Sequence, residues 1–220
     1  PIHTVKSGPA MAPVAGLNYA RIEDFGSDVI ICDTGGTTFD VGLVRDGEVK
    51  FTRDTWIGPQ WTGDILAISS VDVRSIGAGG GSIAWIDKGG MLRVGPESAG
   101  ADPGPACYGH GGTKATVTDA NLVLGRINPD NFLGGEMKLD KAAAEKAVQA
   151  VADELGRSAE ETALAVTQIA NNNMVGALRS VLIERGLDPR DFCMLGFGGA
   201  GPLHVADLMN DAGIPSGIVP

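Results

Sequence analysis

The sequence predicts an α/β fold with a mixed β-sheet and flanking helices. Two buried strands each run into a glycine-rich turn, VIICDTGGTT at 29–38 and FCMLGFGGAG at 192–201. The first turn leads straight into another strand, so at least one strand pair is antiparallel. Two helices are predicted shortly before the second unit, and helical connections are typical of parallel pairing.

The first predicted strand is the continuous apolar run Val29 to Cys32, a pattern typical of a strand buried on both faces. Residues 39–51 then alternate between apolar and polar or small residues. Asp46-Gly47 interrupts the alternation and favours a type I′ hairpin turn. The segment before the first strand reads as a loop.

The middle of the chain, residues 52–115, is glycine-rich and irregular. Short strands are expected at 71–78 and in a hairpin at 82–95, and 98–109 reads as an ordered, packed loop. A short helix is expected to begin near Asp119, with the Asp119 side chain as its cap.

From residue 139 the sequence becomes alanine-rich and helical. One helix is expected over 141–155, with Asp140 as N-cap and Gly156 as its stop. A longer one follows a capping box formed by Ser158 and Glu161, and Gly186 is expected to end it. Another helix is expected at 202–210. The chain thus divides by composition into a β-rich part, 1–138, and a helical part, 139–220.

Composition excludes several classes of protein. The formal net charge of −10 argues against a surface for nucleic acid or anionic membrane. No apolar run reaches the length of a membrane span, no signal peptide is visible, and the three cysteines lack metal-ligand spacing. We therefore expect a cytoplasmic protein with reduced cysteines. The chain begins at Pro1 and ends in GIPSGIVP, so we expect a portion of a longer protein.

The turn at 33–38 admits two interpretations. It can be a hairpin turn with a local hydrogen bond from Asp33. It can also bind phosphate, because Gly35 and Gly36 leave backbone N–H groups unshielded and Thr37 and Thr38 add hydroxyl donors. Asp33 beside a phosphate then indicates Mg²⁺, held through water. Spacing alone leaves both interpretations open.

Two further glycine clusters are ambiguous. Gly198, Gly199, Ala200 and Gly201 lie at a strand-to-helix turn, which favours an anion or polar ligand edge, or simply close packing of helix on strand. The sequence GAGGGS at 77–82 can be an anion-binding nest or a mobile connector.

Several ionisable residues could act as acid, base or ligand, but spacing does not pair them. They are Asp64, Asp102, His110, Asp119, Glu184 and His204. The run Asn171–Asn173 places poor helix formers inside a predicted helix, which indicates either a polar contact or a solvated face.

Long phrases in this chain resemble one family. SGPAMAPVAG, DTGGTTFDVGLV, VDVRSIGAGGGSIAWID, VGPESAGADPGPACYGHGGTKATVTDANLVLGRI and ERGLDPRDFCMLGFGGAGPLH occur in this order. They are similar to the hydantoinase A and 5-oxoprolinase family, which also includes subunits of acetone and acetophenone carboxylases. His110 departs from the YGRGG pattern, where arginine is expected.

The resemblance implies the actin, Hsp70 and sugar-kinase ATPase fold, which is related to ribonuclease H, with this chain forming mainly one lobe. It implies that the Asp33 to Thr38 turn is the second phosphate loop and that Gly198 to Gly201 contact the adenosine of ATP. A first phosphate loop is then expected before Pro1, and the isolated chain is expected to be inactive.

The function implied by the resemblance is ATP binding in an ATP-dependent hydrolase of hydantoin, N-methylhydantoin or 5-oxoproline, with Mg²⁺ and a hydantoinase B-type partner subunit or domain. Two alternatives stay open. One is the ATP-hydrolysing subunit of an acetone- or acetophenone-type carboxylase. The other is a non-catalytic nucleotide-binding or assembly module.

Overall fold

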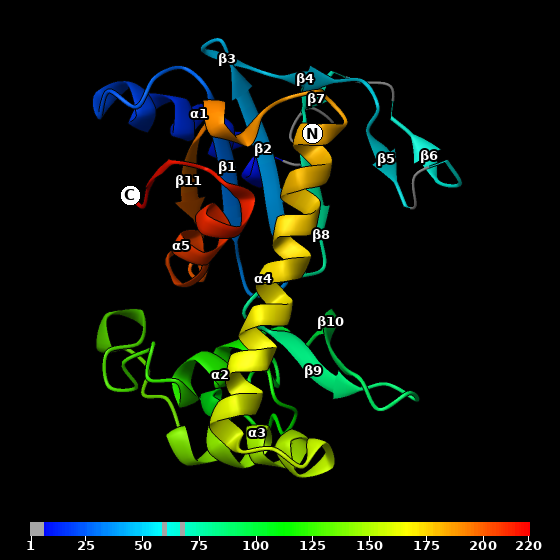
Figure 1. Ribbon diagram of the computed structural model, residues 1–220, viewed down its shortest axis with the longest axis vertical. Helices are drawn as coiled ribbons and strands as arrows, with labels where there is room; N and C mark the ends of the chain where they lie inside the picture. The colour runs from blue at the N-terminus through cyan, green and yellow to red at the C-terminus, as the bar shows by residue number, and fades with distance from the viewer. Residues whose placement is uncertain (1–6, 59–60, 67–68) are drawn as a thin grey trace.

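The computed structural model of the chain describes residues 7–58, 61–66 and 69–220. These residues form two parts, which we call the upper and the lower lobe of this chain after their places in Figure 1. The upper lobe is built on a six-stranded sheet, and the lower lobe contains a hairpin and two helices. Helix α4 (Ala159–Ile183) runs through both lobes, from the bottom of Figure 1 to the top. The loop at 77–81 is a second connection between them, because it leads from β8 to β9.

The upper sheet has the strand order β12-β11-β1-β2-β3, and β8 pairs with the same edge of β2 as β3 does. Its strands are β1 (Val29–Thr34), β2 (Phe39–Arg45), β3 (Glu48–Val49), β8 (Val73–Ile76), β11 (Cys193–Phe197) and β12 (Ser216–Ile218). β1 is antiparallel to β2 and parallel to β11. The predicted mixed sheet is therefore confirmed, and it unites strands from both compositional parts of the chain.

Helices cover both faces of this sheet. α1 (Ser7–Ile22) packs Leu17 and Ala20 against Ile31 and Leu195 on one face. The other face buries its side chains against α4 and α5 (Gly201–Ala212). The main buried residues there are Ile30, Phe39, Met174, Leu178, Met194 and Leu208.

The prediction of a loop before β1 is wrong, because α1 occupies most of that segment. Pro13 lies inside this helix, although proline removes a helical hydrogen bond. The helix persists because it is packed on the sheet. A Cβ atom on Gly42 of β2 would meet the Pro13 ring, with Cγ only 2.6 Å away. Tertiary packing thus outweighs local propensity here.

The predicted hairpin at 39–51 is confirmed as far as Val49. Asp46 and Gly47 both have positive φ, as a type I′ turn requires. Beyond Lys50 the chain leaves the sheet and forms two ribbons. β4 (Phe51–Thr52) pairs with β7 (Ser70–Val71), and β5 (Trp56–Ile57) pairs with β6 (Asp64–Ile65). These ribbons project from the upper lobe in Figure 1.

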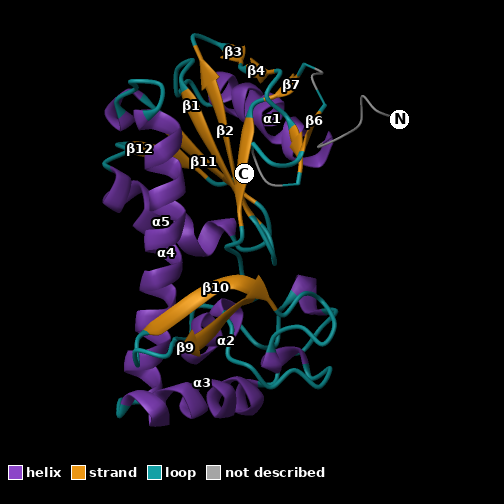
Figure 2. Cartoon of the chain, turned by 90° about the vertical axis from the view of Figure 1, so that its right-hand side faces the viewer, coloured by secondary structure: helices purple, strands orange, loops and turns teal. Residues whose placement is uncertain are grey.

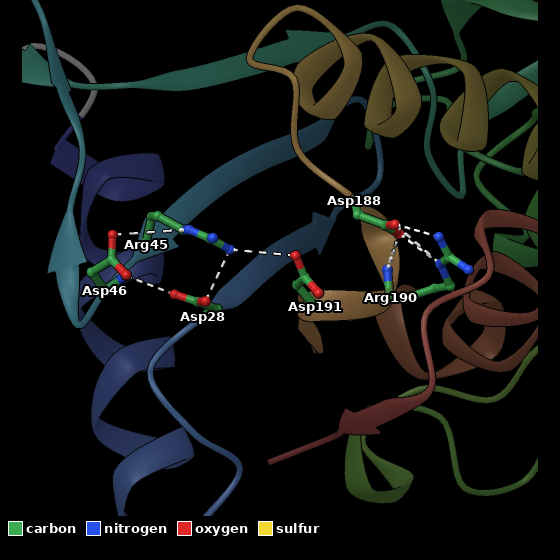
Figure 3. A network of polar contacts seen from close by, with 6 residues as sticks. All are labelled: Asp28, Arg45, Asp46, Asp188, Arg190 and Asp191. Atoms are coloured by element: carbon green, nitrogen blue, oxygen red, sulfur yellow. Dashed lines mark hydrogen bonds and ion pairs between the residues drawn. The ribbon is translucent and has the colours of Figure 1, made fainter.

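Arg45 ties together the edge of the sheet at the start of β1 (Figure 3). Its guanidinium forms an ion pair with Asp28 at 2.9 Å and lies 5.5 Å from the centroid of the Phe192 ring. Asp46 and Asp191 each lie 3.9 Å from the same guanidinium. These contacts fix the hairpin turn of β2 to the segments that precede β1 and β11.

The lower lobe contains the predicted hairpin β9 (Ser82–Ile86) and β10 (Leu92–Ser98). In Figure 2, α2 (Val117–Val123) lies behind the hairpin and α3 (Lys141–Leu155) lies below it. Short 3-10 turns occur at Ala106–Tyr108 and Leu133–Gly135, and another at Pro189–Asp191 precedes β11. In the part of the chain that the structure describes, no helix is both long enough and apolar enough to cross a membrane.

The helix caps agree largely with prediction. Asp140 caps α3, Gly156 ends it, and Ser158 and Glu161 form the capping box of α4. Helix α4 ends at Ile183, three residues before Gly186. The predicted cap of α2 is wrong. Thr116 is its N-cap, and Asp119 completes a capping box from the third helical position.

Candidate functional site

The turn between β1 and β2 is both a hairpin turn and an exposed glycine loop. β1 ends at Thr34 and β2 begins at Phe39, and the Gly35 N–H donates to the Thr38 carbonyl at 3.0 Å. Gly36, Thr37 and Thr38 are exposed at its tip. The hairpin turn is therefore confirmed, and with the tip exposed, phosphate binding stays a prediction.

Two carboxylates lie side by side beneath this loop. Asp33 and Asp40 are directly paired across β1 and β2. Burial raises the pKa of the Asp33 carboxyl, and the negative charge of Asp40 raises it further. Asp40 accepts hydrogen bonds from the Thr38 hydroxyl at 3.1 Å and from the Ser75 hydroxyl. Sequence reasoning missed Asp40, although a four-residue loop after Thr34 pairs these two positions.

The second predicted turn lies at the same edge of the sheet. Because β11 runs parallel to β1, with Phe197 beside Asp33, Gly198 to Gly201 emerge next to the first loop. The Ala200 N–H donates to the Thr34 carbonyl at 3.0 Å. Gly198 has φ of +82°, and a Cβ atom there would collide with Asp33 and Thr34. The structure thus brings the two predicted loops together.

A third glycine loop, residues 77–82, packs behind the first. Gly79, Gly80 and Gly81 are buried, and their N–H groups donate to protein acceptors. The N–H groups of Gly79–Gly81 are therefore not available to an anion, so this loop is not an open anion nest. Its contacts with the first loop show that it supports that loop.

A cavity of about 460 Å³ opens beside the first two loops. One wall is glycine backbone, and the other is largely apolar, with the Tyr108 and Phe132 rings 5.7 Å apart. The lining residues are Gly35, Gly36, Gly80, Tyr108, Thr118, Ile127, Asn131, Phe132, Leu133, Met137, Gly199, Ala200 and Leu203. The apolar wall was not predicted, because most of its residues come from irregular segments between the expected elements.

The other ionisable candidates lie elsewhere or have structural partners. Asp119 is fully buried and accepts hydrogen bonds from the N–H groups of Ala106, Cys107 and Thr116. Hydrogen bonds from Arg74 and Ser180 lower the pKa of Glu184 to about 2. His204 is buried against the Asn171 side chain. The side chains of Asp64, Asp102 and His110 are exposed, and none of the three lines the cavity.

The acidic pair suits a hard cation. Carboxylate and hydroxyl oxygens are the ligands that Mg²⁺ prefers, and this ion keeps several waters. Asp33, Asp40 and Thr38 supply such oxygens at the mouth of the first loop. Among the described residues no group of three or more His, Cys, Asp or Glu side chains is arranged to hold a metal. A cation here would therefore complete its shell with water and ligand oxygens.

Comparison with known proteins agrees with this architecture. The caprolactamase subunit alpha of Pseudomonas jessenii is 44% identical over 221 residues, a match that covers 100% of this chain and 31% of that protein. The crystal structure of the ATP-dependent caprolactamase from Pseudomonas jessenii superimposes with a TM-score of 0.84 at 45% identity, covering 97% of this chain and 30% of that chain.

The nucleotide-free structure of acetone carboxylase, described as an enzyme of ATP-dependent acetone carboxylation, gives a TM-score of 0.83 at 33% identity, over 96% of this chain and 30% of that one. The chain thus spans about a third of the length of these relatives. These likenesses confirm the predicted actin-like ATPase fold. The model of the hydantoinase/oxoprolinase family matches residues 1–220. The chain therefore belongs to the hydantoinase/oxoprolinase family.

Proposed function

We propose that this chain is the ATP-binding part of a longer ATP-dependent hydrolase that opens cyclic amides of the hydantoin, N-methylhydantoin or 5-oxoproline type. One observation carries the proposal: two glycine loops meet at one edge of the sheet, directly beside an apolar cavity of about 460 Å³. A phosphate chain needs exposed N–H groups, and a purine base needs a flat apolar cavity.

The first loop would hold the phosphates. The N–H groups of Gly36 and Thr37 and the Thr37 hydroxyl would donate toward the ligand, while Asp33 and Asp40 would orient the waters of Mg²⁺. The second loop, Gly198 to Gly201, would contact the adenosine, with the base beside Tyr108 and Phe132. The positive end of α5 (Gly201–Ala212) adds a favourable potential for an anion.

The chemistry of an amide explains the need for ATP. An unstrained amide is a poor electrophile, and transfer of a phosphoryl group to its oxygen creates a leaving group. The residues of this chain would act mainly by positioning the phosphates and by stabilising negative charge with backbone N–H groups. The groups that contact the amide would come from the rest of the longer protein.

A second function, the ATP-hydrolysing subunit of an acetone- or acetophenone-type carboxylase, is favoured by the likeness to acetone carboxylase. Both enzymes use the same nucleotide site, so the site does not separate them. The full-length protein with its partner should be assayed for ATP hydrolysis with hydantoins, with 5-oxoproline, and with ketones plus bicarbonate. Turnover only with ketone and bicarbonate would favour the carboxylase.

We also propose a hydantoinase B-type partner subunit, because the caprolactamase and acetone carboxylase relatives belong to enzymes whose chains are named as subunits. Co-purification of the full-length protein with a co-expressed hydantoinase B-type subunit tests this. If the full-length protein hydrolyses ATP at the same rate without the subunit as with it, the proposal of a partner subunit is contradicted.

The nucleotide site is tested by changing its acidic pair. Asp33→Asn and Asp40→Asn keep the size of each side chain but remove the charge that holds the hydrated cation. We expect each to weaken Mg-ATP binding by about tenfold or more, measured by calorimetric titration of the full-length protein. The matched control is Asp64→Asn, since Asp64 is an exposed carboxylate on a projecting ribbon.

If both variants bind Mg-ATP as tightly as the wild type, neither carboxylate contributes to the nucleotide site. Nucleotide binding without any substrate-dependent turnover, in the complete assembly, would favour the non-catalytic module instead.

A further inference from the structure

The loop that links the two lobes contains three consecutive buried glycines, Gly79 to Gly81. It leaves the upper sheet at the end of β8 and enters the lower hairpin at Ser82. On the way it passes directly behind the loop at 35–38. Nothing in the proposed nucleotide contacts requires such a loop, so its function needs a separate account.

Backbone hydrogen bonds join this loop to the first glycine loop. The Gly80 N–H donates to the Gly35 carbonyl at 3.0 Å, and the Gly81 N–H donates to the Gly36 carbonyl at 2.7 Å. Each bond fixes the plane of a peptide whose other end lies in the exposed tip. The Gly35 and Gly36 carbonyls are therefore held toward residues 80 and 81, and in a trans peptide the N–H groups of Gly36 and Thr37 point the opposite way.

The same glycines are anchored in the lower lobe. The Gly80 carbonyl accepts hydrogen bonds from the N–H and the hydroxyl of Thr118, at 2.8 and 2.9 Å. The Gly81 carbonyl accepts from the Ala99 N–H at 2.9 Å. A continuous set of hydrogen bonds thus runs from the first glycine loop through residues 79–81 to α2 and to the segment after β10.

No side chain fits at these positions. A Cβ atom on Gly79 would lie 2.7 Å from the Gly35 carbonyl oxygen, and one on Gly81 would lie 2.9 Å from the Gly36 carbonyl oxygen. Both neighbours are backbone atoms, so neither can rotate away. A Cβ atom on Gly80 would lie 2.8 Å from the Thr118 hydroxyl oxygen. The close approach of the two loops requires glycine at all three positions.

We infer that Gly79–Gly81 form a backbone clamp that positions the phosphate-binding loop, and that Thr118 fixes this clamp to the lower lobe. The inference rests on the proposed nucleotide site. The clamp residues are positioning residues: they hold the peptides of Gly35 and Gly36 in the orientation that lets the tip bind the phosphates. They also make the site depend on the placement of the lower lobe.

The test compares ligands with and without phosphates. Gly79→Ala and Gly81→Ala each place a Cβ atom against a carbonyl oxygen of the first loop. Neither residue lines the cavity. In the full-length protein we expect each variant to weaken Mg-ATP by about tenfold, the cost of misaligning one or two hydrogen bonds to a charged group, while adenosine binds as in the wild type. General damage to the fold would weaken both ligands.

The matched control is Gly176→Ala, in an exposed and open position of α4. It should leave both affinities unchanged. Equal ATP affinity in the wild type and both clamp variants would overturn the clamp, and so would equal loss of ATP and adenosine. If the wild-type protein binds neither ligand, the proposed nucleotide site itself fails, and the clamp with it.

A second pair of variants decides the case if an alanine at 79 or 81 prevents folding. Thr118→Val removes the hydroxyl that donates to the Gly80 carbonyl but keeps the shape, and Thr118→Ser keeps the hydroxyl. Thr118 also lines the cavity, so adenosine is measured beside ATP. We expect about fivefold weaker ATP binding for valine with unchanged adenosine binding, and restoration by serine, as for one lost hydrogen bond. Wild-type ATP affinity in the valine variant would overturn the clamp.

Discussion

At the scale of single residues, His204 shows how surroundings fix the state of a side chain. It is 1% exposed, and its Nδ1 lies 2.7 Å from the Asn171 side-chain oxygen. Since the Asn171 amide donates to Asp207 at 2.8 Å, its oxygen is the acceptor and His204 the donor. This explains the asparagine in the middle of α4, which the sequence left open between a polar contact and a solvated face.

The surroundings of His204 also make stability depend on pH. Its pKa is lowered to about 4, chiefly by burial; Asp207 opposes this shift, and Arg126 contributes to it. Below the ordinary histidine pKa the His204 imidazole is protonated in the unfolded chain but stays neutral in the folded chain. The free energy of unfolding therefore falls as pH drops from about 6.5 to 4, by roughly 1.4 kcal/mol per pH unit at most from this residue.

His204→Asn tests this, because asparagine offers an N–H near the position of Nδ1 but does not titrate. We expect urea unfolding at pH 7 and at pH 5 to show a smaller loss of stability in the variant than in the wild type. Parallel curves for the two proteins would show that His204 is not the group responsible.

At the scale of elements, α5 sits unusually close to β11. A Cβ atom on Gly196 would overlap the Val205 side chain, and one on Gly217 of β12 would overlap Met209. The two glycines therefore leave a shallow groove on the sheet, and the Val205 and Met209 side chains of α5 pack into it. This close packing places the start of α5, and with it the loop at 198–201, beside Asp33.

Filling the groove should displace the helix. We expect Gly196→Ala to lower the free energy of unfolding by about 1–3 kcal/mol through overpacking. Val205→Ala removes the overlapping methyl groups, so the double variant should lose less than the sum of the two single losses. Chemical denaturation of the four proteins measures this coupling. Strictly additive losses would mean that the two residues do not press on each other.

At the scale of the whole molecule, the two lobes share one helix and one glycine clamp. α4 contributes Val166 and Ala170 to the lower core and Met174 and Leu178 to the upper core. The candidate cavity also draws on both lobes, with Gly199 and Ala200 above and Phe132 below. The site therefore exists only when the lobes are held in register, and a continuous α4 is the largest element that holds them.

Breaking α4 just above the junction of the two cores should uncouple the lobes. Gly176→Pro removes a helical N–H and introduces a steric clash, at a cost of about 3 kcal/mol. We expect the amides of β9 and β10 to exchange hydrogen at lower urea concentration than those of β1 and β2, whereas Gly176→Ala should keep one common transition. A single transition in the proline variant would show that the other contacts suffice for coupling.

Much of the fold was predictable because its signals are local. The strand-turn-strand at 29–45, the Asp46-Gly47 turn, the caps Asp140 and Ser158, and the mixed sheet all follow from short patterns of residues. The start of the chain was not predictable in this way. Its proline and glycine indicate a loop, whereas packing on the sheet, including the contact of Pro13 with Gly42, keeps α1 helical.

By itself, the sequence determined the family of this protein and the positions of the two glycine loops. Family motifs and tight turns depend on consecutive residues, so both can be recognised without the tertiary structure. The tertiary structure decided what those loops meet. It paired Asp33 with Asp40, set Gly79 to Gly81 behind the first loop, and assembled the apolar wall around Phe132. These contacts join residues far apart in the chain or on opposite strands, and only the packing of the two lobes brings them within reach.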